Sequence, residues 1–478
     1  MKRSSPRTPS LPVARRVSPA LLLAGFSTLA LGALLPLSAA HAATASLAEN
    51  LAANLAENPA ENLTANAGVS WHFAFGTPRP GYTTVQAAMV YDTKRGFGFE
   101  PGADVRTDGV LTVVKPSYFT ANLPEGNYNV TVRLGAAGTA SNTTIKSELR
   151  RLALENVSTA SGAIETRTFT VNVRTPRIKA VPGVAAGVVD LKVPRETVSE
   201  ARVWDQALTL ELNGTHPVIE SIDIVPVTAP TIFLLGDSTV SDQPGEPFNS
   251  WGQMLPRFFK PGIAVANLAQ SGETYRDSLA RRRLDKILSM MRPGDTVLMQ
   301  FGHNDQKQIK DNKGGPFTTY KDEIRQHVAA IRKHGGVPVI LSSMERRRFD
   351  DAGKPQETLT DYALAARQSA QELGTAFIDL HPMSLALYGT LGVEGSKAAF
   401  AEPQPGKLDN THHNPYGSYE LAQAVVTGLR KTGVPAAQWI APGYGNFDPS
   451  HPDPVASFAV PVSPTFTNER PLGDEGNK

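Results

Sequence analysis

Short runs in which hydrophobic and polar residues alternate fill the chain from about Val69 to Val227. Every second residue is hydrophobic in WHFAF (71–75), YNVTVRL (128–134), TFTVNV (168–173) and LTLELNG (208–214), and Gly, Pro, Asn and Asp separate the runs. This alternation is typical of antiparallel strands with one buried face. Because no long helical period interrupts the runs, we predict an all-β sandwich over residues 69–228.

From Thr231 onward the pattern changes to continuous hydrophobic runs. These are TIFLL (231–235), TVLMQF (296–301), VPVILSS (337–343) and AFIDL (376–380). They alternate with segments of helical length near 276–291, 319–334, 360–374 and 416–431. Strands buried on both faces and alternating with helices predict a parallel sheet in an α/β domain, here residues 229–435. Residues 436–478 are rich in proline and predict an extended tail, packed on that domain or trailing from it.

The first 42 residues have the pattern of an export signal. A basic segment ends at Arg16, a hydrophobic stretch follows, and the small residues Ala40 and Ala42 suit a signal peptidase that cleaves after Ala42. The alternative is a membrane anchor, which Pro36 and the small-residue end disfavour. We therefore expect a secreted or periplasmic protein with no membrane partner after cleavage. The Arg15-Arg16 pair is compatible with a twin-arginine route, although adjacent arginines are common in leaders.

Residues 43–68 repeat asparagine every four positions and carry Pro59, which indicates a low-complexity linker.

Composition and charge exclude several classes of protein. The formal net charge of +2 includes five basic and no acidic residues in the leader, so the remainder carries 2 − 5 = −3. That charge gives no support for a nucleic-acid partner. The 478-residue chain has no cysteine, which excludes disulfides and thiolate chemistry.

Several polar residues follow the predicted parallel strands. Ligand sites of open parallel sheets form at the carboxyl ends of the strands. The residues are Ser238 in GDS, Gly272 in NLAQSGET, Asn304 in FGHND, and Asp409 and His412 in DNTHHNPYG. Each alone has a structural explanation: a turn serine, a glycine with positive φ, a turn cap or a helix cap.

Together these residues form the set that acyl transfer requires. A serine hydroxyl needs a base to take its proton, and a histidine serves near neutral pH when a carboxylate fixes its tautomer. The oxyanion needs preset donors, here the backbone N–H groups of Ser238 and Gly272 and the amide of Asn304. No metal-ligand spacing accompanies His303, His412 and His413, so we expect neither a metal nor another cofactor.

The motifs GDS, NLAQSG, GHND and DNTH resemble the four blocks of the SGNH (GDSL-like) hydrolases, which have a three-layer α/β/α fold. With SWGQMLPRFF and RRRFDDAGK, the region from Thr231 to Val434 is similar to bacterial rhamnogalacturonan acetylesterases. The segment around YDTKRGFGFE (91–100) resembles the galactose-binding-like sandwich that precedes some of these esterases. The resemblance implies that Ser238 is the nucleophile, His412 the base and Asp409 its orienting acid. Relatives often have Gly-Arg-Ser where this chain has Gly272-Glu273-Thr274, so the basic residue of the relatives is lost at this position.

The run Arg346–Arg347–Arg348 follows the strand at 337–343 and therefore falls at the same edge of the sheet. Guanidinium groups there could hold the carboxylates of a uronate-containing substrate, and the alternative is a solvated loop. We therefore expect a secreted esterase that removes acetyl groups from pectic rhamnogalacturonan. The alternatives are an esterase for acetylated xylan or small acyl esters, and a non-catalytic carbohydrate-binding protein.

Overall fold

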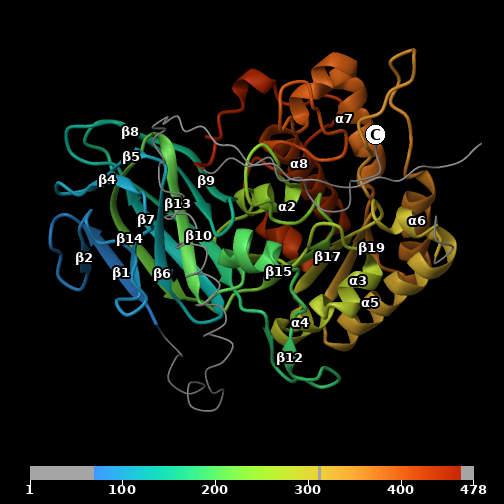
Figure 1. The fold of residues 1–478 in the computed structure, drawn as a ribbon, viewed down its shortest axis with the longest axis horizontal. Coiled ribbons are helices and arrows are strands. Elements are labelled where there is room, and N and C mark those ends of the chain that lie inside the picture. The colour runs from blue at the N-terminus through green and yellow to red at the C-terminus, as the bar shows by residue number, and fades with distance from the viewer. Residues whose placement is uncertain (1–68, 310–313, 465–478) are drawn as a thin grey trace, which may run out of the picture. The chain divides into compact units, whose positions relative to one another are not determined.

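The computed structural model describes residues 69–309 and 314–464, all of which belong to one compact unit of the chain (Figure 1). The predicted leader (1–42), the low-complexity segment (43–68) and the last part of the tail (465–478) lie outside the described residues. The cleavage site and the export route therefore stay predictions.

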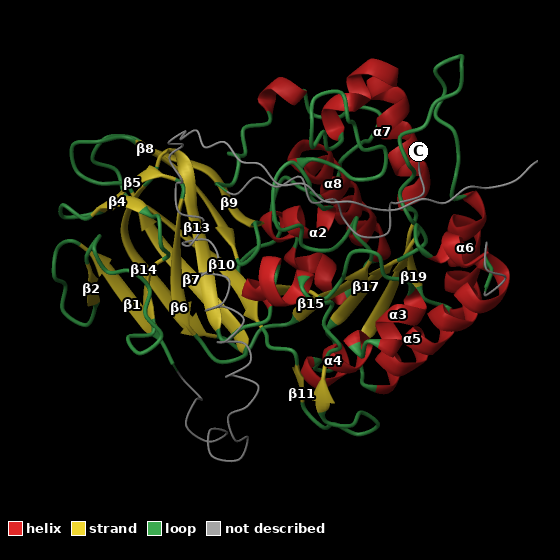
Figure 2. Ribbon diagram, in the orientation of Figure 1, coloured by secondary structure: helices red, strands yellow, loops and turns green. Residues whose placement is uncertain are grey.

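Two mostly antiparallel sheets form the amino-terminal region, and a small two-stranded ribbon lies apart from them, next to helix α4 (Arg283–Met290) (Figure 2). The seven-stranded sheet contains β1 (Trp71–Phe75), β2 (Thr83–Val85), β4 (Asp104–Arg106), β5 (Leu111–Lys115), β7 (Gly126–Leu134), β10 (Glu165–Val173) and β14 (Val218–Pro226). The five-stranded sheet contains β3 (Phe97–Phe99), β6 (Ser117–Asn122), β8 (Ser141–Ser147), β9 (Arg151–Thr159) and β13 (Ala207–His216). The ribbon is β11 (Arg177–Ile178) and β12 (Gly187–Val188). The predicted all-β sandwich is confirmed.

The hydrophobic positions of the alternating runs fill the core of the sandwich. On β7 the side chains of Tyr128, Val130, Val132 and Leu134 are buried and their neighbours are less so. On β13, however, the intervening polar residues are buried as well. One reason is that the described part of the tail packs there: Ser463 Oγ donates to Glu211 Oε2 at 2.8 Å.

A five-stranded parallel sheet forms the second region, in the order β16–β15–β17–β18–β19. The strands are β15 (Thr231–Gly236), β16 (Ala264–Asn267), β17 (Thr296–Gln300), β18 (Val337–Leu341) and β19 (Ala376–Ile378). The chain leaves β15 toward β16 on one side and then returns to β17 on the other. The strand order therefore reverses beside β15, and such a reversal opens a crevice at the carboxyl ends of the strands.

Alternate residues of β15 point into two different cores. Ile232 and Leu234 belong to one hydrophobic cluster, and Phe233 and Leu235 belong to another. Helices cover both faces, as Figure 2 shows: on the first face α2 (Trp251–Met254), α7 (Leu380–Gly395) and α8 (Pro415–Thr432), and on the second α3 (Tyr275–Ala280), α4 (Arg283–Met290), α5 (Lys321–Lys333) and α6 (Thr360–Leu373). The predicted three-layer α/β/α architecture is confirmed.

Two of the helix predictions differ from the structure. The prediction of a single helix near 276–291 is wrong. The helix is interrupted between α3 and α4, where Arg282 has a left-handed φ of 61°. Helix α7 was not predicted. Its sequence LHPMSLALYGTLGVEG is hydrophobic on all sides and contains Pro382 and Gly389, so it shows no amphipathic period.

Side chains of the sandwich region enter both cores of the α/β domain. Leu152 of β9 belongs to the core that contains α8. Leu149 and five residues of the connection between β10 and β13 belong to the core that contains α4 and α5; the five are Ile178, Val184, Val189, Val203 and Trp204. We call residues 174–206 the β10–β13 connection; it includes η1 (Arg195–Ser199) and η2 (Ala201–Val203). The predicted boundary at 228/229 therefore separates two folds that share hydrophobic cores.

Candidate active site

Ser238 lies in a tight turn directly after β15. Backbone N–H groups of Val240 and Ser241 donate to Asp237 O at 3.1 and 2.9 Å and close the turn. The glycine before the turn is required by close packing, because a Cβ on Gly236 would lie only 2.7 Å from the carbonyl oxygen of Gln300. The strand therefore ends in a fixed turn that presents the Ser238 side chain.

The structure brings Ser238, His412 and Asp409 together in one hydrogen-bonded line. His412 Nε2 lies 2.8 Å from Ser238 Oγ, and His412 Nδ1 lies 3.1 Å from Asp409 Oδ2. The loop before α8 (415–432) carries both the histidine and the aspartate. These distances suit the transfer of the Ser238 proton to His412.

The surroundings of Asp409 keep it ionised. Burial opposes the charge, but the neighbouring His412 ring and hydrogen bonds outweigh it, so that the pKa of Asp409 is well below its ordinary value. Asp409 Oδ1 accepts the backbone N–H groups of Thr411 at 2.8 Å and His412 at 2.9 Å. An ionised Asp409 holds the proton of His412 on Nδ1 and leaves Nε2 to face Ser238.

The predicted oxyanion donors belong to two further loops. Gly272 follows β16 and has a φ of 76°, a backbone conformation that residues with a Cβ rarely adopt. Asn304 follows β17, and its Nδ2 donates to the carbonyl oxygen of Glu273 at 3.2 Å, while Lys307 Nζ donates to its Oδ1 at 3.1 Å. This fixes the amide orientation of Asn304 and ties it to the Gly272 loop. Its Nδ2 carries a second hydrogen that can serve an oxyanion.

A buried pair that the sequence analysis missed joins the Ser238 turn to the Asn304 loop. Asp237 Oδ2 lies 3.2 Å from His303 Nδ1, and Asp237 Oδ1 accepts the backbone N–H and the hydroxyl of Thr239. Burial raises the pKa of Asp237, but the His303 ring and the hydrogen bonds lower it further, so the net shift is downward. The sequence does contain a signal for this pair, because Asp237 and His303 each directly precede a predicted site residue.

His413, next to the predicted base, has different surroundings. Its Nε2 lies 2.8 Å from the hydroxyl of Tyr388, and its ring packs on Phe400. Burial lowers the pKa of His413 to about 3. The neutral His413 ring therefore supports the loop by packing against the protein interior, whereas the His412 ring faces Ser238.

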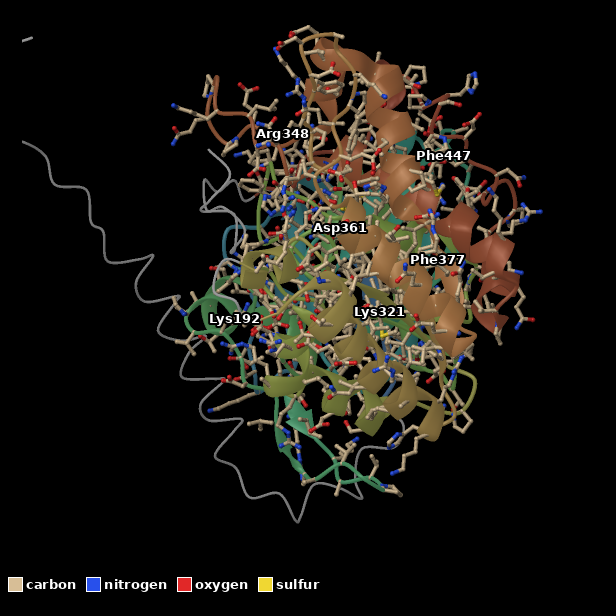
Figure 3. All side chains as sticks on the ribbon, turned by 90° about the vertical axis from the view of Figure 1, so that its right-hand side faces the viewer. Lys192, Lys321, Arg348, Asp361, Phe377 and Phe447 are labelled. Atoms are coloured by element: carbon tan, nitrogen blue, oxygen red, sulfur yellow. The ribbon has the colours of Figure 1, made fainter. Side chains whose placement is uncertain are left out.

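The three arginines of the 346–348 run lie in different environments. Arg346 is buried, and its guanidinium donates to Gln306 Oε1 and Thr358 Oγ1 at 3.1 and 3.0 Å and to the His303 carbonyl at 3.3 Å. Arg347 joins the loop to the one that carries the predicted triad, because its backbone N–H donates to Asn410 O at 2.8 Å. Arg348 is exposed (Figure 3). A substrate-binding role stays a prediction for all three.

Glu345 holds the start of the arginine loop in place. It accepts the backbone N–H groups of Thr358 and Leu359 at 2.7 and 2.6 Å and lies 2.9 Å from His381 Nε2. Burial raises the pKa of Glu345, but the hydrogen bonds from His381 and Thr358 outweigh it, so the pKa falls to about 2. The ionised carboxylate thus closes the loop from residue 346 to residue 359.

No cluster of three or more histidine, cysteine or carboxylate side chains suited to a metal ion occurs in ranges 69–309 and 314–464. Within the same ranges no helix combines the length and hydrophobicity needed to cross a membrane.

Comparison with known proteins identifies the α/β region. Residues 234–417 match the model of the GDSL-like lipase/acylhydrolase family. Rhamnogalacturonan acetylesterase RhgT of Bacillus subtilis (strain 168) is 37% identical over 214 residues, which cover 43% of this chain and 91% of the relative.

A second group of matches extends beyond this region. The uncharacterized esterase YxiM of the same bacterium is 28% identical over 390 residues, covering 76% of this chain and 90% of the relative. That length exceeds residues 229–478, so the similarity reaches into the sandwich. The crystal structure of YxiM covers 77% of this chain and all of its own, with 25% identity and a TM-score of 0.43. The predicted resemblance is confirmed: this chain belongs to the GDSL-like lipase/acylhydrolase family and is an esterase.

Proposed function

We propose that this esterase removes acetyl groups from pectic rhamnogalacturonan through an acetyl-serine intermediate. The observation that supports the chemistry best is the hydrogen-bonded line Ser238–His412–Asp409 at the carboxyl end of β15 (2.8 and 3.1 Å). The similarity to proteins named rhamnogalacturonan acetylesterase supports the choice of substrate.

In the first half of the reaction, Ser238 Oγ attacks the acetyl carbonyl carbon while His412 Nε2 takes the hydroxyl proton. The carbonyl π-electrons move to oxygen, and the resulting oxyanion accepts hydrogen bonds from the Ser238 and Gly272 backbone N–H groups and from Asn304 Nδ2. The intermediate collapses, the ester C–O bond breaks, and His412 gives its proton to the departing sugar oxygen, which leaves as a hydroxyl group. The acetyl group remains on Ser238.

In the second half, a water molecule replaces the sugar. His412 takes a proton from the water as the water oxygen attacks the acetyl-serine carbonyl, and the same donors hold the second oxyanion. Collapse breaks the acyl bond to Ser238 Oγ, which regains a proton from His412, and acetic acid leaves. Asp409 stays ionised throughout and stabilises the protonated His412.

Arg348 supports the proposed preference for a pectic chain. Its exposed side chain belongs to a loop that is hydrogen-bonded to Asn410, next to the proposed catalytic aspartate. A galacturonate backbone carries regularly spaced carboxylates, whereas a neutral xylan backbone carries none. A guanidinium beside the proposed active site would therefore bind a pectic chain more tightly than a xylan chain.

The proposal is tested by acetate release from acetylated rhamnogalacturonan and acetylated xylan, each with the wild-type protein and with Ser238→Ala. We expect faster release from the pectic polymer and no release by the variant. Faster release from xylan would contradict the substrate, and release by a folded Ser238→Ala variant would contradict the mechanism. We further propose that the leader directs export, which amino-terminal sequencing of the secreted protein would test by showing that it begins at Ala43.

A further inference from the structure

The β10–β13 connection of the sandwich region contacts the loops of the proposed active site directly. Lys192 Nζ donates to the carbonyl oxygen of Ser271 at 2.6 Å, immediately before the oxyanion glycine Gly272 (Lys192 is labelled in Figure 3). Lys192 Nζ also lies 3.7 Å from the carboxylate of Glu273, immediately after that glycine. One side chain of the connection therefore holds both flanks of Gly272.

The residue after Gly272 is anchored to the same connection by buried charges. Both carboxylate oxygens of Glu273 accept from Arg283 Nε at 2.8 and 2.7 Å. The other end of the Arg283 guanidinium donates to Glu196 of η1 at 3.0 and 2.7 Å. All three side chains are essentially inaccessible to solvent. Glu273 thus ties the oxyanion loop to η1, at the position where the sequence departs from its relatives.

A second chain of contacts runs from η1 to the nucleophile turn through Gln243. Gln243 Nε2 donates to the carbonyl oxygen of Ser238 at 2.6 Å and lies 3.3 Å from Ser271 Oγ. Its other amide atom, Oε1, accepts from Arg195 Nη2 at 3.1 Å. One buried amide therefore joins the nucleophile turn, the oxyanion loop and the sandwich region.

Arg195 determines which way this amide points. A guanidinium can only donate, so it selects the orientation in which Gln243 Oε1 faces Arg195 and the NH₂ group faces Ser238. Arg195 is itself held by an ion pair with Glu200, whose other oxygen accepts from Gln270 Nε2 at 2.6 Å. Gln270 lies in the Gly272 loop, which closes a buried ring of hydrogen bonds.

We propose that the β10–β13 connection is part of the catalytic machinery, with Arg195 as a positioning residue that acts on the Ser238 turn through Gln243. The inference rests on the proposed role of Ser238 as the nucleophile. Its consequence is that the sandwich does not act only as a separate sugar-binding module, because it sets the geometry of the nucleophile and of the oxyanion loop.

The test compares Arg195→Met with Arg257→Met in the full chain, using 4-nitrophenyl acetate. Arg257 also pairs with the sandwich, through Glu155 at 2.9 Å, and its guanidinium donates on its other side to the hydroxyl of Tyr444 at 2.9 Å, away from the Ser238 and Gly272 loops. We expect Arg195→Met to lower kcat about tenfold with KM changed less than about twofold, since small displacements of a reacting group cost one to two orders of magnitude in rate. Arg257→Met should lower Tm and leave the kcat of the folded protein unchanged.

A double-mutant cycle separates positioning from general stability. If Arg195 acts through Gln243, then Arg195→Met combined with Gln243→Ala should be no slower than Gln243→Ala alone. Equal kcat in Arg195→Met and the wild type, or losses that multiply in the double variant, would overturn the inference. If Arg195→Met is insoluble, Gln243→Ala alone carries the test, and an unchanged kcat in that variant would overturn the inference.

Ser238→Ala, measured in the same series, keeps the two proposals distinguishable. An inactive Ser238→Ala variant together with a fully active Arg195→Met variant would refute the positioning role but would not contradict the proposed mechanism. An active Ser238→Ala would refute the mechanism itself, whatever the arginine variants do.

Discussion

His412 Nε2 lies 2.8 Å from Ser238 Oγ, although 174 positions separate the two residues in the chain. The contact forms because Ser238 lies in the turn after β15, the strand between β16 and β17, and the loop before α8 crosses the same edge of the sheet. We expect Ser238→Ala and His412→Ala each to abolish hydrolysis of 4-nitrophenyl acetate, and to similar extents, because triad residues act as a unit. Asp409→Asn should lose less activity than either variant if the His412 ring can still reorient. Circular dichroism would verify that each variant is folded.

The amide of Asn304 gives a second prediction, on the oxyanion. Glu273 O and Lys307 Nζ fix its orientation, so the second Nδ2 hydrogen is preset for the transition state. Asn304→Ala should lower kcat by about 10²–10³ with little change in KM. The exposed Asn446 serves as the control, and Asn446→Ala should leave kcat unchanged. A loss confined to KM would mean that Asn304 binds substrate in the ground state.

The sequence predicted the members of the proposed triad because each of them follows a recognisable pattern. Ser238 follows a hydrophobic run, and Asp409 precedes His412 by three residues before a helix, which brings both onto one loop. Gln243 and Arg195 leave no such pattern. Their contact joins a sandwich loop to the nucleophile turn, and pairing between buried polar groups from different folds depends on tertiary packing alone.

The same reasoning explains why the sequence predicted the location of the arginine run but not the environment of each arginine. The location, at the carboxyl ends of the strands, followed from the strand that precedes the run. The direction of each guanidinium depends on neighbours that are distant in sequence. Arg346 donates to Gln306 and to Thr358. A run of like residues gives no indication of which member faces solvent.

The third prediction concerns substrate choice by Arg348. A hydrogen bond between a guanidinium and a carboxylate is worth roughly 1.5–3 kcal/mol, so Arg348→Ala should cost about tenfold to a hundredfold in kcat/KM on acetylated rhamnogalacturonan. It should cost little on 4-nitrophenyl acetate, which has no carboxylate. Arg346→Ala should slow both substrates, because its guanidinium supports the carbonyl of His303 beside Asn304. Equal losses on both substrates for Arg348→Ala would indicate a structural role.

The fourth prediction concerns stability in acid, through Glu345. Its pKa falls from 4.5 to about 2 in the folded protein. A carboxylate with a lowered folded-state pKa stabilises the protein above the unfolded-state pKa, and this contribution is lost as the pH falls from about 4.5 toward 2. The contribution at neutral pH is up to about 3 kcal/mol.

Glu345→Gln should therefore lower the free energy of unfolding at pH 7 and flatten its decline between pH 5 and pH 2. Urea unfolding at several pH values measures both effects. Glu372→Gln, an exposed glutamate that pairs with Lys321, is the control and should leave the pH profile unchanged. A Glu345→Gln profile parallel to that of the wild type would mean that another carboxylate dominates the acid transition.

The last prediction concerns the shared cores and rests on Trp204. This side chain comes from the β10–β13 connection, is buried in the core that contains α4 and α5, and donates from Nε1 to Glu196 at 3.0 Å. Trp204→Ala should cost about 3–5 kcal/mol, as large-to-small substitutions of buried aromatics do. Since the residue links the sandwich to the α/β domain, calorimetry of the wild type should show one unfolding transition, and the variant should shift all of it. Two transitions in the wild type, with only one shifted in the variant, would mean that the two folds are stable independently.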